Sequence, residues 1–369
     1  MADPANRSRH ELAATLALAQ IPGVGPVRMR KLIAESGSAE AALRGRGGRV
    51  DAGYAILERL DALKARALLA GDPDFPPMLA QMNDPPEVLY VWGDLAQAHR
   101  RAVAFVGSRD GTPYGIAAAR MLARDVAATG QVTIVSGMAR GVDRAAHEAA
   151  LDAGGGSVGV LGCGFGVVYP PSNEALYRRM LEHGCLITEI PPDQPPHQGA
   201  FPRRNRLISG LTLATVVVEA AVKSGALITV DAALEQGRTV LAVPGPITSP
   251  TSVGCNKLIQ QGAKPALTAG DILEEIGLPR GDSGLGDLGM GIGGGATTPA
   301  SPIPIPRRPP PDLDALQRSL WDLMGPELRH VDVLVAAGGG DASRVLSALT
   351  DLEMRGIVRQ EPGMRFGLR

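Results

Sequence analysis

Three features are scarce in this sequence of 369 residues, and each shortage argues against a class of protein. Aromatic residues make up only 3% of the chain, which argues against a broad base-stacking platform and leaves one or two stacking rings. The three cysteines, Cys163, Cys185 and Cys255, are odd in number and far apart. They predict reduced thiols in a cytoplasmic protein and neither a disulfide framework nor a zinc site. The longest apolar stretch, residues 213–222, contains Glu219 and is too short to span a membrane.

An excess of positive charge is also missing. The chain has 37 lysines and arginines against 38 aspartates and glutamates, so no global basic field indicates a nucleic-acid partner. Any such site has to be a local patch. The hydrophobic fraction of 44% is that of an ordinary globular protein, and the length suits two or three domains.

Composition divides the chain into four segments. Residues 1–71 are predicted to form a small helical domain, because apolar residues from 8 to about 70 recur at helical spacing without strand-like alternation. Residues 72–278 form the core, and residues 279–312 are a linker rich first in glycine and then in proline. Residues 313–369 are predicted to contain three helices and a hairpin that turns at 361–364, as in a winged helix, with Asp341 as a helix N-cap.

The core alternates short β-branched runs with helical patterns, which predicts an α/β fold: a doubly wound, mostly parallel, Rossmann-like sheet with helices on both faces. After a short extended run at Val88–Trp92, the expected strands are Ala102–Val106, Val132–Val135, Ser157–Leu161, Leu186–Thr188, Thr215–Val218 and Thr239–Val243. The expected helices between them include Tyr114–Thr129, Val142–Ala153 and Ala226–Gln236. Ligands of such sheets bind beyond the carboxyl ends of the strands, so the loops there are the candidate sites.

The loop after the first core strand is predicted to bind an anion. Gly107, Ser108 and Arg109 open this loop, Thr112 can cap the following helix, and Pro113 suits its first position. Free amides at the helix start, the helix dipole and the arginine charge together favour a phosphate. The alternative is a tight turn with a solvated arginine.

Two further strand ends carry glycines beside a cation. After the second strand, Gly137 lets the backbone approach a ligand closely and Arg140 adds positive charge. At a later strand end, Lys223, Ser224 and Gly225 open a helix that can hold an anion.

Two isolated titratable residues near these loops are given structural interpretations. His147 lies in the helix after the second loop, where packing or capping is favoured over catalysis. Glu219, at a strand end, has the position of a general base, but pairing with an arginine of the basic segment is favoured.

The clearest positive patch is the segment from Phe201 to Gly210, predicted as a loop. Residues 194–218 contain three arginines and no acidic residue. Phe201 can stack on a base, and Asn205 lies among the arginines Arg203, Arg204 and Arg206. The alternative is a solvated turn with a buried phenylalanine. Because the carboxyl ends of parallel strands meet at one edge, this segment and Arg109 are predicted to line one groove.

The two ends of the chain carry weaker patterns. Residues 21–25 (Ile-Pro-Gly-Val-Gly), followed by Arg28, Arg30 and Lys31, are typical of a helix-hairpin-helix. Its turn amides can hold a phosphate without reading sequence, although a protein contact is an equal alternative. The expected recognition helix at 341–355 is acidic on balance, which favours a protein contact or packing over groove reading.

Taken in order, these motifs resemble the DNA-processing protein A (DprA, or Smf) family over about residues 72–270. They are Pro85-Pro86 with Leu89-Tyr90-Val91-Trp92-Gly93, Val106-Gly107-Ser108-Arg109, Thr112-Pro113-Tyr114-Gly115, Ser136-Gly137-Met138-Ala139-Arg140-Gly141-Val142-Asp143 with Ala146-His147, Tyr169-Pro170-Pro171, Phe201-Pro202-Arg203-Arg204-Asn205-Arg206, Ser224-Gly225-Ala226-Leu227-Ile228-Thr229 and Val243-Pro244-Gly245.

The resemblance implies an extended Rossmann-like core flanked by a SAM-like or helix-hairpin-helix domain and a winged helix. It also implies a homodimer that binds single-stranded DNA in a groove of the core. Such proteins load RecA recombinase onto DNA held by single-strand-binding protein, in natural transformation and recombination. The family's Gly-Ser-Arg arginine corresponds to Arg109, and its basic loop corresponds to Phe201–Arg206.

Two rival functions remain for the same pattern. A nucleotide-binding or ligand-binding enzyme would need Gly-x-Gly-x-x-Gly after the first strand, but the glycines stand at 107, 111 and 115. No P-loop, metal cluster or nucleophile elbow appears, so the sequence predicts no catalytic residue, no metal and no cofactor. The second rival is a winged-helix transcription regulator, against which the acidic helix argues.

Overall fold

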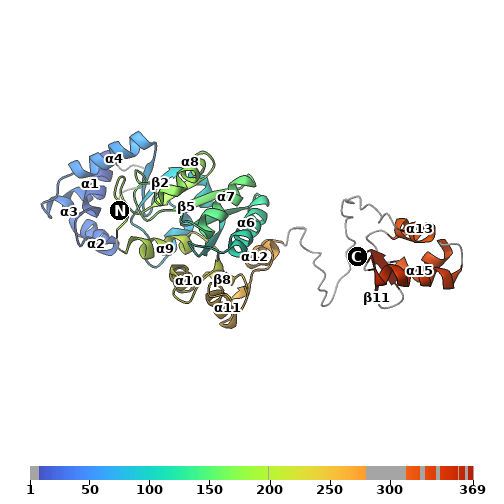
Figure 1. The fold of residues 1–369 in the computed structure, drawn as a ribbon. Helices are drawn as coiled ribbons and strands as arrows, with labels where there is room; N and C mark the ends of the chain where they lie inside the picture. Colours follow the sequence, from blue (N-terminus) through green and yellow to red (C-terminus); the bar gives the residue numbers. More distant parts are fainter. Residues whose placement is uncertain are drawn as a thin grey trace. The chain divides into compact units, whose positions relative to one another are not determined.

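The computed structural model describes residues 8–197, 199–279, 313–324, 329–337, 341–355, 357–361 and 365–368, which fall into two separate units (Figure 1). In the described part of the first unit, the strands form a single sheet. Its members are β1 (Arg66–Leu69), β2 (Val88–Gly93), β3 (Arg101–Gly107), β4 (Val132–Ser136), β5 (Ser157–Val160), β6 (Cys185–Thr188), β7 (Ala214–Glu219), β8 (Thr239–Ala242) and β9 (Lys264–Pro265).

The order of the strands places a switch point in the middle of the sheet. From edge to edge the order is β1-β2-β6-β5-β4-β3-β7-β8-β9; β2 pairs antiparallel with both β1 and β6, and all the other pairs are parallel. The chain winds outward from β3 through β4, β5 and β6, and then returns to place β7 on the other side of β3. Ligands of doubly wound sheets bind beyond the carboxyl ends of the two strands at such a point.

Helices cover both faces of this sheet because its strands are apolar on both sides. On β3, Val103 and Phe105 face one hydrophobic cluster, and Ala104 and Val106 face another. α6 (Pro113–Ala128), α7 (Val142–Asp152) and α12 (Ala269–Glu275) pack on the first face, whereas α9 (Ala200–Gly210), α10 (Gly225–Glu235) and α11 (Val253–Gln260) pack on the second. The short α5 (Pro77–Ala80) also lies on the second face, and α8 (Glu174–His183) contributes to a third cluster.

The predicted fold class is confirmed, and the predicted core strands and helices lie within one or two residues of those observed. One element of the N-terminal segment was predicted wrongly. Residues 66–69 form β1 and not a helix, because they pair with β2 in an antiparallel ladder and bury Leu68 and Leu69. Partners about twenty residues away therefore override the local helical pattern.

The N-terminal helices share a hydrophobic cluster with the core. They are α1 (Arg9–Ala19), α2 (Pro26–Ser36), α3 (Ala39–Arg44) and α4 (Asp51–Leu63). Leu16 and Leu60 belong to the same buried cluster as Tyr90 of β2 and Tyr177 of α8. A bidentate ion pair from the α4 arginine at position 59 to Asp193, at 2.6 and 2.9 Å, adds a polar link. The hairpin between α1 and α2 is therefore held against the core.

The second unit is a winged helix, as the sequence predicted. It contains α13 (Ala315–Leu323), β10 (Arg329–His330), α14 (Val331–Ala337), α15 (Ala342–Met354), β11 (Val358–Glu361) and β12 (Arg365–Leu368). The Asp341 carboxylate accepts a hydrogen bond from the amide of Arg344, which confirms its predicted capping role. The linker after residue 279 and the hairpin turn at 362–364 lie outside the described residues. None of the described helices is long and apolar enough to cross a membrane.

Candidate functional site

A cleft of about 500 Å³ lies at the carboxyl ends of β3 and β7, at the switch point of the sheet. We call it the central cleft. Nine of the predicted site residues line it: Gly107, Ser108, Arg109, Phe201, Arg204, Asn205, Lys223, Ser224 and Gly225. Three segments far apart in the sequence are thus brought together at one edge, as the parallel topology requires.

A neighbouring pocket of about 370 Å³ opens from the same wall and contains two more predicted residues, Gly137 and Arg140. It shares Arg109, Phe201 and Arg204 with the central cleft. A Cβ atom added at residue 137 would lie 2.3 Å from the Arg204 guanidinium. Glycine is therefore required there for the arginine to approach the loop.

Glu219 ties the first loop to the end of β7. Its carboxylate accepts hydrogen bonds from the Thr112 amide and hydroxyl, both at 2.8 Å, and from the Thr251 hydroxyl at 2.5 Å. The residue is 2% exposed, so the expected pairing with an arginine of the basic segment is wrong. Hydroxyl and amide donors satisfy this carboxylate where no cation reaches it. Thr112 also caps α6 as predicted, since its hydroxyl accepts from the amide of Gly115.

An aromatic side chain stands between the two cationic loops. The Arg109 guanidinium lies over the ring of Phe201 at 5.3 Å from its centroid, and the ring of Tyr169 packs on Phe201 at 5.4 Å. A Cβ atom added at Gly162 would lie 2.8 Å from the same ring. Phe201 is partly buried, so one edge of the stack remains accessible from the central cleft.

The basic segment is a helix, α9, and not the predicted loop. Pro202 falls in its first turn, where proline is tolerated, and Gly199 precedes it with a φ of 86°. The helical period distributes the three arginines into three environments. Arg203 is exposed, Arg206 has 16% of its side chain exposed, and Arg204 is 6% exposed.

Arg204 is a buried structural cation beneath the central cleft. One of its terminal nitrogens donates to the carbonyls of Gly137 and Val160, at the ends of β4 and β5. Burial lowers the pKa of this guanidinium, and the nearby Asp143 opposes that effect. Burial in turn raises the pKa of Asp143, which accepts from the amides of Gly137 and Ala139. Arg204 thus holds the floor of the cleft.

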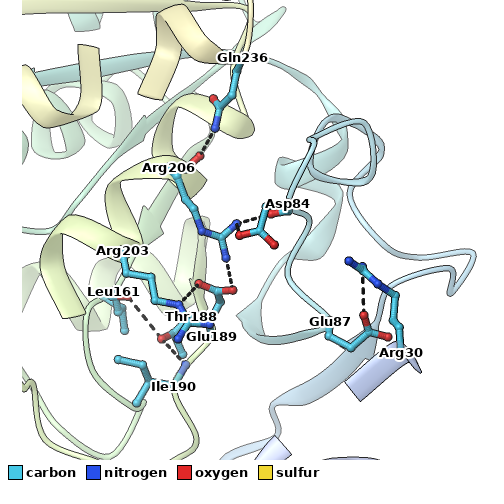
Figure 2. Close-up of polar contacts among 10 residues, drawn as sticks. All are labelled: Arg30, Asp84, Glu87, Leu161, Thr188, Glu189, Ile190, Arg203, Arg206 and Gln236. Carbon is cyan, nitrogen blue, oxygen red and sulfur yellow. Dashed lines mark hydrogen bonds and ion pairs between the residues drawn. The ribbon is translucent and has the colours of Figure 1, made fainter. Parts of the chain in front are cut away.

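Arg206 and Arg203 face Glu189 on the other side of α9 (Figure 2). Arg206 donates to the Glu189 carboxylate at 2.5 Å and to the carbonyl of Asp84 at 2.6 Å. Arg203 lies 3.7 Å from the same carboxylate. Burial raises the pKa of Glu189, and the two arginines oppose this shift. The prediction of a single groove is therefore wrong in part. Arg109 and Arg204 both line the central cleft, whereas Arg203 and Arg206 lie on the other side of α9.

The remaining predicted cations differ in how they are paired. Arg140 lies 3.3 Å from Asp110, and both side chains are mostly exposed. Arg109 and Lys223 are exposed, and neither forms an ion pair with any residue that the structure describes. These two cations keep their charge available to an anion in the cleft.

Residues with catalytic or metal-binding potential are buried in structural roles. His147 is fully buried beside Ser157, its Nδ1 atom 2.7 Å from the hydroxyl, and burial lowers its pKa to about 3. This agrees with the packing role expected from the sequence. All three cysteines are free and buried. Among the described residues, no group of three histidine, cysteine, aspartate or glutamate side chains is placed to hold a metal ion.

Sequence reasoning missed three residues of this region. Tyr169 supports the ring of Phe201, Asp143 anchors the loop after β4, and Glu189 pairs with both Arg203 and Arg206. Tyr169 and Asp143 stand within motifs of the family pattern, so a signal for them existed. Glu189 lies at the end of β6, outside the acid-free window that defined the basic segment.

Comparison with known proteins matches most of the chain to one family. The family model for DNA recombination-mediator protein A matches residues 66–277, and the model for the DprA winged helix domain matches residues 304–364. Protein Smf of Synechocystis is 33% identical, covering 97% of this chain and 99% of its own length. Protein Smf of Escherichia coli is 38% identical, over 82% and 77% respectively.

Two solved structures resemble the fold. DNA processing protein A from Streptococcus pneumoniae has a TM-score of 0.57 at 30% identity, covering 74% of this chain and 94% of that one. A structure that concerns the single-stranded-DNA-binding mode of DNA processing protein A from Helicobacter pylori has a TM-score of 0.53. Its identity is 27%, over 58% and 96% of the two chains.

Proposed function

Because this chain belongs to the DNA processing protein A (DprA, or Smf) family, we propose that it binds single-stranded DNA in the central cleft. The observation that carries the proposal is the wall of the cleft formed by Arg109, Phe201 and Lys223. It combines two unpaired cations with an accessible aromatic ring. The relative from Helicobacter pylori, whose structure concerns single-stranded DNA binding, supports the same substrate.

The two cations and the ring have complementary tasks. Exposed guanidinium and ammonium groups attract phosphates regardless of base sequence, and Arg109 offers the planar donors that match phosphate oxygens. The start of α10, capped by Ser224, adds a favourable helix dipole at the same cleft. Phe201 offers the accessible part of its ring to a base, and every base has a π-face that can pack against it. The cleft therefore suits sequence-independent binding.

We propose further that the protein acts by holding DNA and not by catalysis. The two residues best placed for proton transfer, Glu219 and His147, are buried and hydrogen-bonded within the fold. The family resemblance adds the remaining parts of the proposal: a homodimer that protects single-stranded DNA and loads RecA recombinase onto DNA held by single-strand-binding protein, in transformation and recombination.

The binding proposal is tested with a short labelled oligo-dT titrated across a salt series. Each phosphate neutralised in a single strand contributes about −0.7 to the slope of log affinity against log salt. Arg109→Ala should weaken binding and flatten that slope by about one contact. Arg46→Ala, at an exposed arginine between α3 and α4, should change neither quantity. If Arg109→Ala binds like the parent at every salt concentration, the central cleft is not the site.

A further inference from the structure

A second crevice lies on the other side of α9 from the central cleft. It has a volume of about 210 Å³ and runs between the hairpin at residues 21–25 and the core. We call it the hairpin crevice. Val24, Gly25 and Pro26 line it from the helical side, and Tyr90 and Arg203 line it from the core. Figure 2 shows three charged residues of its lining, Glu87, Glu189 and Arg203, with their partners.

The start of α2 has free donors, and its N-cap residue Gly25 lines this crevice. Gly25 is the N-cap of α2 and has no side chain to satisfy the first amides. The amides of Gly25, Val27 and Arg28 make no hydrogen bond with any residue that the structure describes. Free amides and the positive end of the helix dipole together favour an anion.

A buried hydroxyl points independently to a ligand. Tyr90, on β2, is 1% exposed, lines the crevice, and its hydroxyl lacks a hydrogen-bond partner among the described residues. Burial raises the pKa of this phenol, so the group remains a donor. An unpaired buried donor is costly, and a ligand that supplies an acceptor removes that cost.

The two acids of the crevice do not repel an anion strongly, because arginines pair with both. Glu87 lies 3.2 Å from Arg30, and Glu189 lies between Arg203 and Arg206 (Figure 2). Arg206 also lies 4.0 Å from Asp84, so three arginines face three acids around the crevice and no net negative charge opposes an anion at the free amides.

The hairpin crevice and the central cleft are separate hollows on the two sides of α9, with Arg204 in the lining of each. Ala200 and Leu207 of α9 face the crevice, and Asn205 and Ile208 face the cleft. A strand leaving the cleft therefore has only one helix, roughly 10 Å across, to pass before it reaches the hairpin.

We propose that the hairpin crevice is a second contact for the same single strand. The free amides of α2 hold a phosphate there, and the Tyr90 hydroxyl donates to an acceptor of the adjoining nucleotide. This inference rests on the proposed function, because the central cleft provides the first contact. It assigns the helix-hairpin-helix a DNA contact where the sequence left a protein contact equally open.

Gly25→Asp tests this contact without disturbing the fold. Gly25 has an extended backbone with φ of −82°, and a Cβ atom added there meets nothing within 4 Å. Aspartate is a favoured N-cap, so the variant should keep α2. Its carboxylate would occupy the free amides and repel a phosphate. Gly25→Asn is the matched control, because it caps the helix without a charge.

Binding is measured with oligo-dT of about 6 and about 16 nucleotides, lengths that span the range of single-strand site sizes. For the longer strand, Gly25→Asp should lose affinity on the order of tenfold and flatten the salt slope by about 0.7. Gly25→Asn should lose less. Tyr90→Phe, which removes only the hydroxyl, should weaken the longer strand alone. The 6-mer should bind all three variants like the parent.

The outcomes separate the two proposals. If Gly25→Asp and Tyr90→Phe bind the 16-mer like the parent, the hairpin crevice is not a contact, and the central cleft stands. A loss for Gly25→Asn equal to that for Gly25→Asp would also overturn the inference, because charge would then play no part. If the parent binds neither length, the proposed function itself fails.

Discussion

The two sides of α9 carry the same residue type in opposite electrostatic states. On the central-cleft side, Arg109 lies exposed over Phe201 and no described acid pairs with it. On the other side, Arg206 is held by Glu189 at 2.5 Å and by a backbone carbonyl of Asp84. A cation that is already paired has little charge left for a phosphate. The number of arginines in a segment therefore sets only an upper limit on its phosphate contacts.

Arg204 lies between the two sides and is committed to the fold. It lines the hollows on both sides of α9, yet its donors go to carbonyls of Gly137 and Val160. A phosphate that reaches this wall meets a guanidinium already committed to the fold. Arg109 and Lys223 therefore supply the charge that attracts a phosphate, and Arg204 maintains the shape of the central cleft. Substitutions on the two sides of α9 should therefore differ in their effect on single-strand binding.

Replacing each of the two inner arginines of α9 by alanine should separate the two sides most clearly. Arg204→Ala leaves two buried carbonyls unsatisfied, and each such group costs about 1–3 kcal/mol. We expect a loss of roughly 2–6 kcal/mol in the free energy of unfolding by urea, together with the largest loss of affinity for short oligo-dT. Arg206→Ala also destabilises the fold, because it leaves Glu189 buried without its nearest cation.

The discriminating measurement is affinity at a temperature where both variants stay folded by circular dichroism. Folded Arg206→Ala should bind the short strand like the parent, whereas folded Arg204→Ala should not. If the two folded variants bind with equal affinity, the two sides of α9 contribute equally to DNA binding in the central cleft, and the comparison fails.

Phe201→Ala should give the next largest effect and should change a different quantity. Losing a stacking ring costs about 1–3 kcal/mol of binding free energy, whereas the number of neutralised phosphates stays the same. Affinity for oligo-dT should fall while the salt slope remains that of the parent. Phe201→Tyr, which keeps the ring, is the control. A flattened slope for the alanine variant would show that the ring acts mainly by positioning Arg109.

Much of the fold was predictable because its signals are local and repeated. The β-branched runs of β3, β4 and β7 and the Thr112-Pro113 helix start specify their elements from a few neighbouring residues. β1 escaped prediction because residues 66–69 become a strand only by pairing with β2. The hydrophobic pattern of four residues cannot predict a strand whose pairing partner is brought close only by the tertiary fold.

The site was predictable as a set of loops but not as a set of contacts. The parallel topology brings Gly107, Arg109 and Lys223 together wherever their side chains point. The helical state of residues 200–210 decides which arginine points where, and a one-residue step on a helix turns a side chain by about a quarter of a turn. The window without acids was correctly identified, but Glu189 reaches its arginines from the neighbouring strand end.

The smallest effect is expected at Asp110, an exposed acid that lies beside Arg140. Asp110 lies 3.3 Å from Arg140, and their side chains are 84% and 58% exposed. Exposed pairs of this kind contribute only about 0.2–1 kcal/mol, in contrast to the buried pair of Glu189 and Arg206. Asp110→Asn should therefore release Arg140 at little cost to stability and raise affinity for oligo-dT by at most about fivefold.

The salt series makes this last prediction specific. If the released Arg140 contacts a phosphate, the slope of log affinity against log salt should steepen, by at most about 0.7. Asp61→Asn, which breaks the similarly exposed pair with Arg9, should leave both affinity and slope unchanged. An affinity gain with an unchanged slope would mean that Asp110 acts only by its general repulsion of the strand. No gain at all would place Arg140 beyond the reach of the DNA and confine the attracting surface to Arg109 and Lys223.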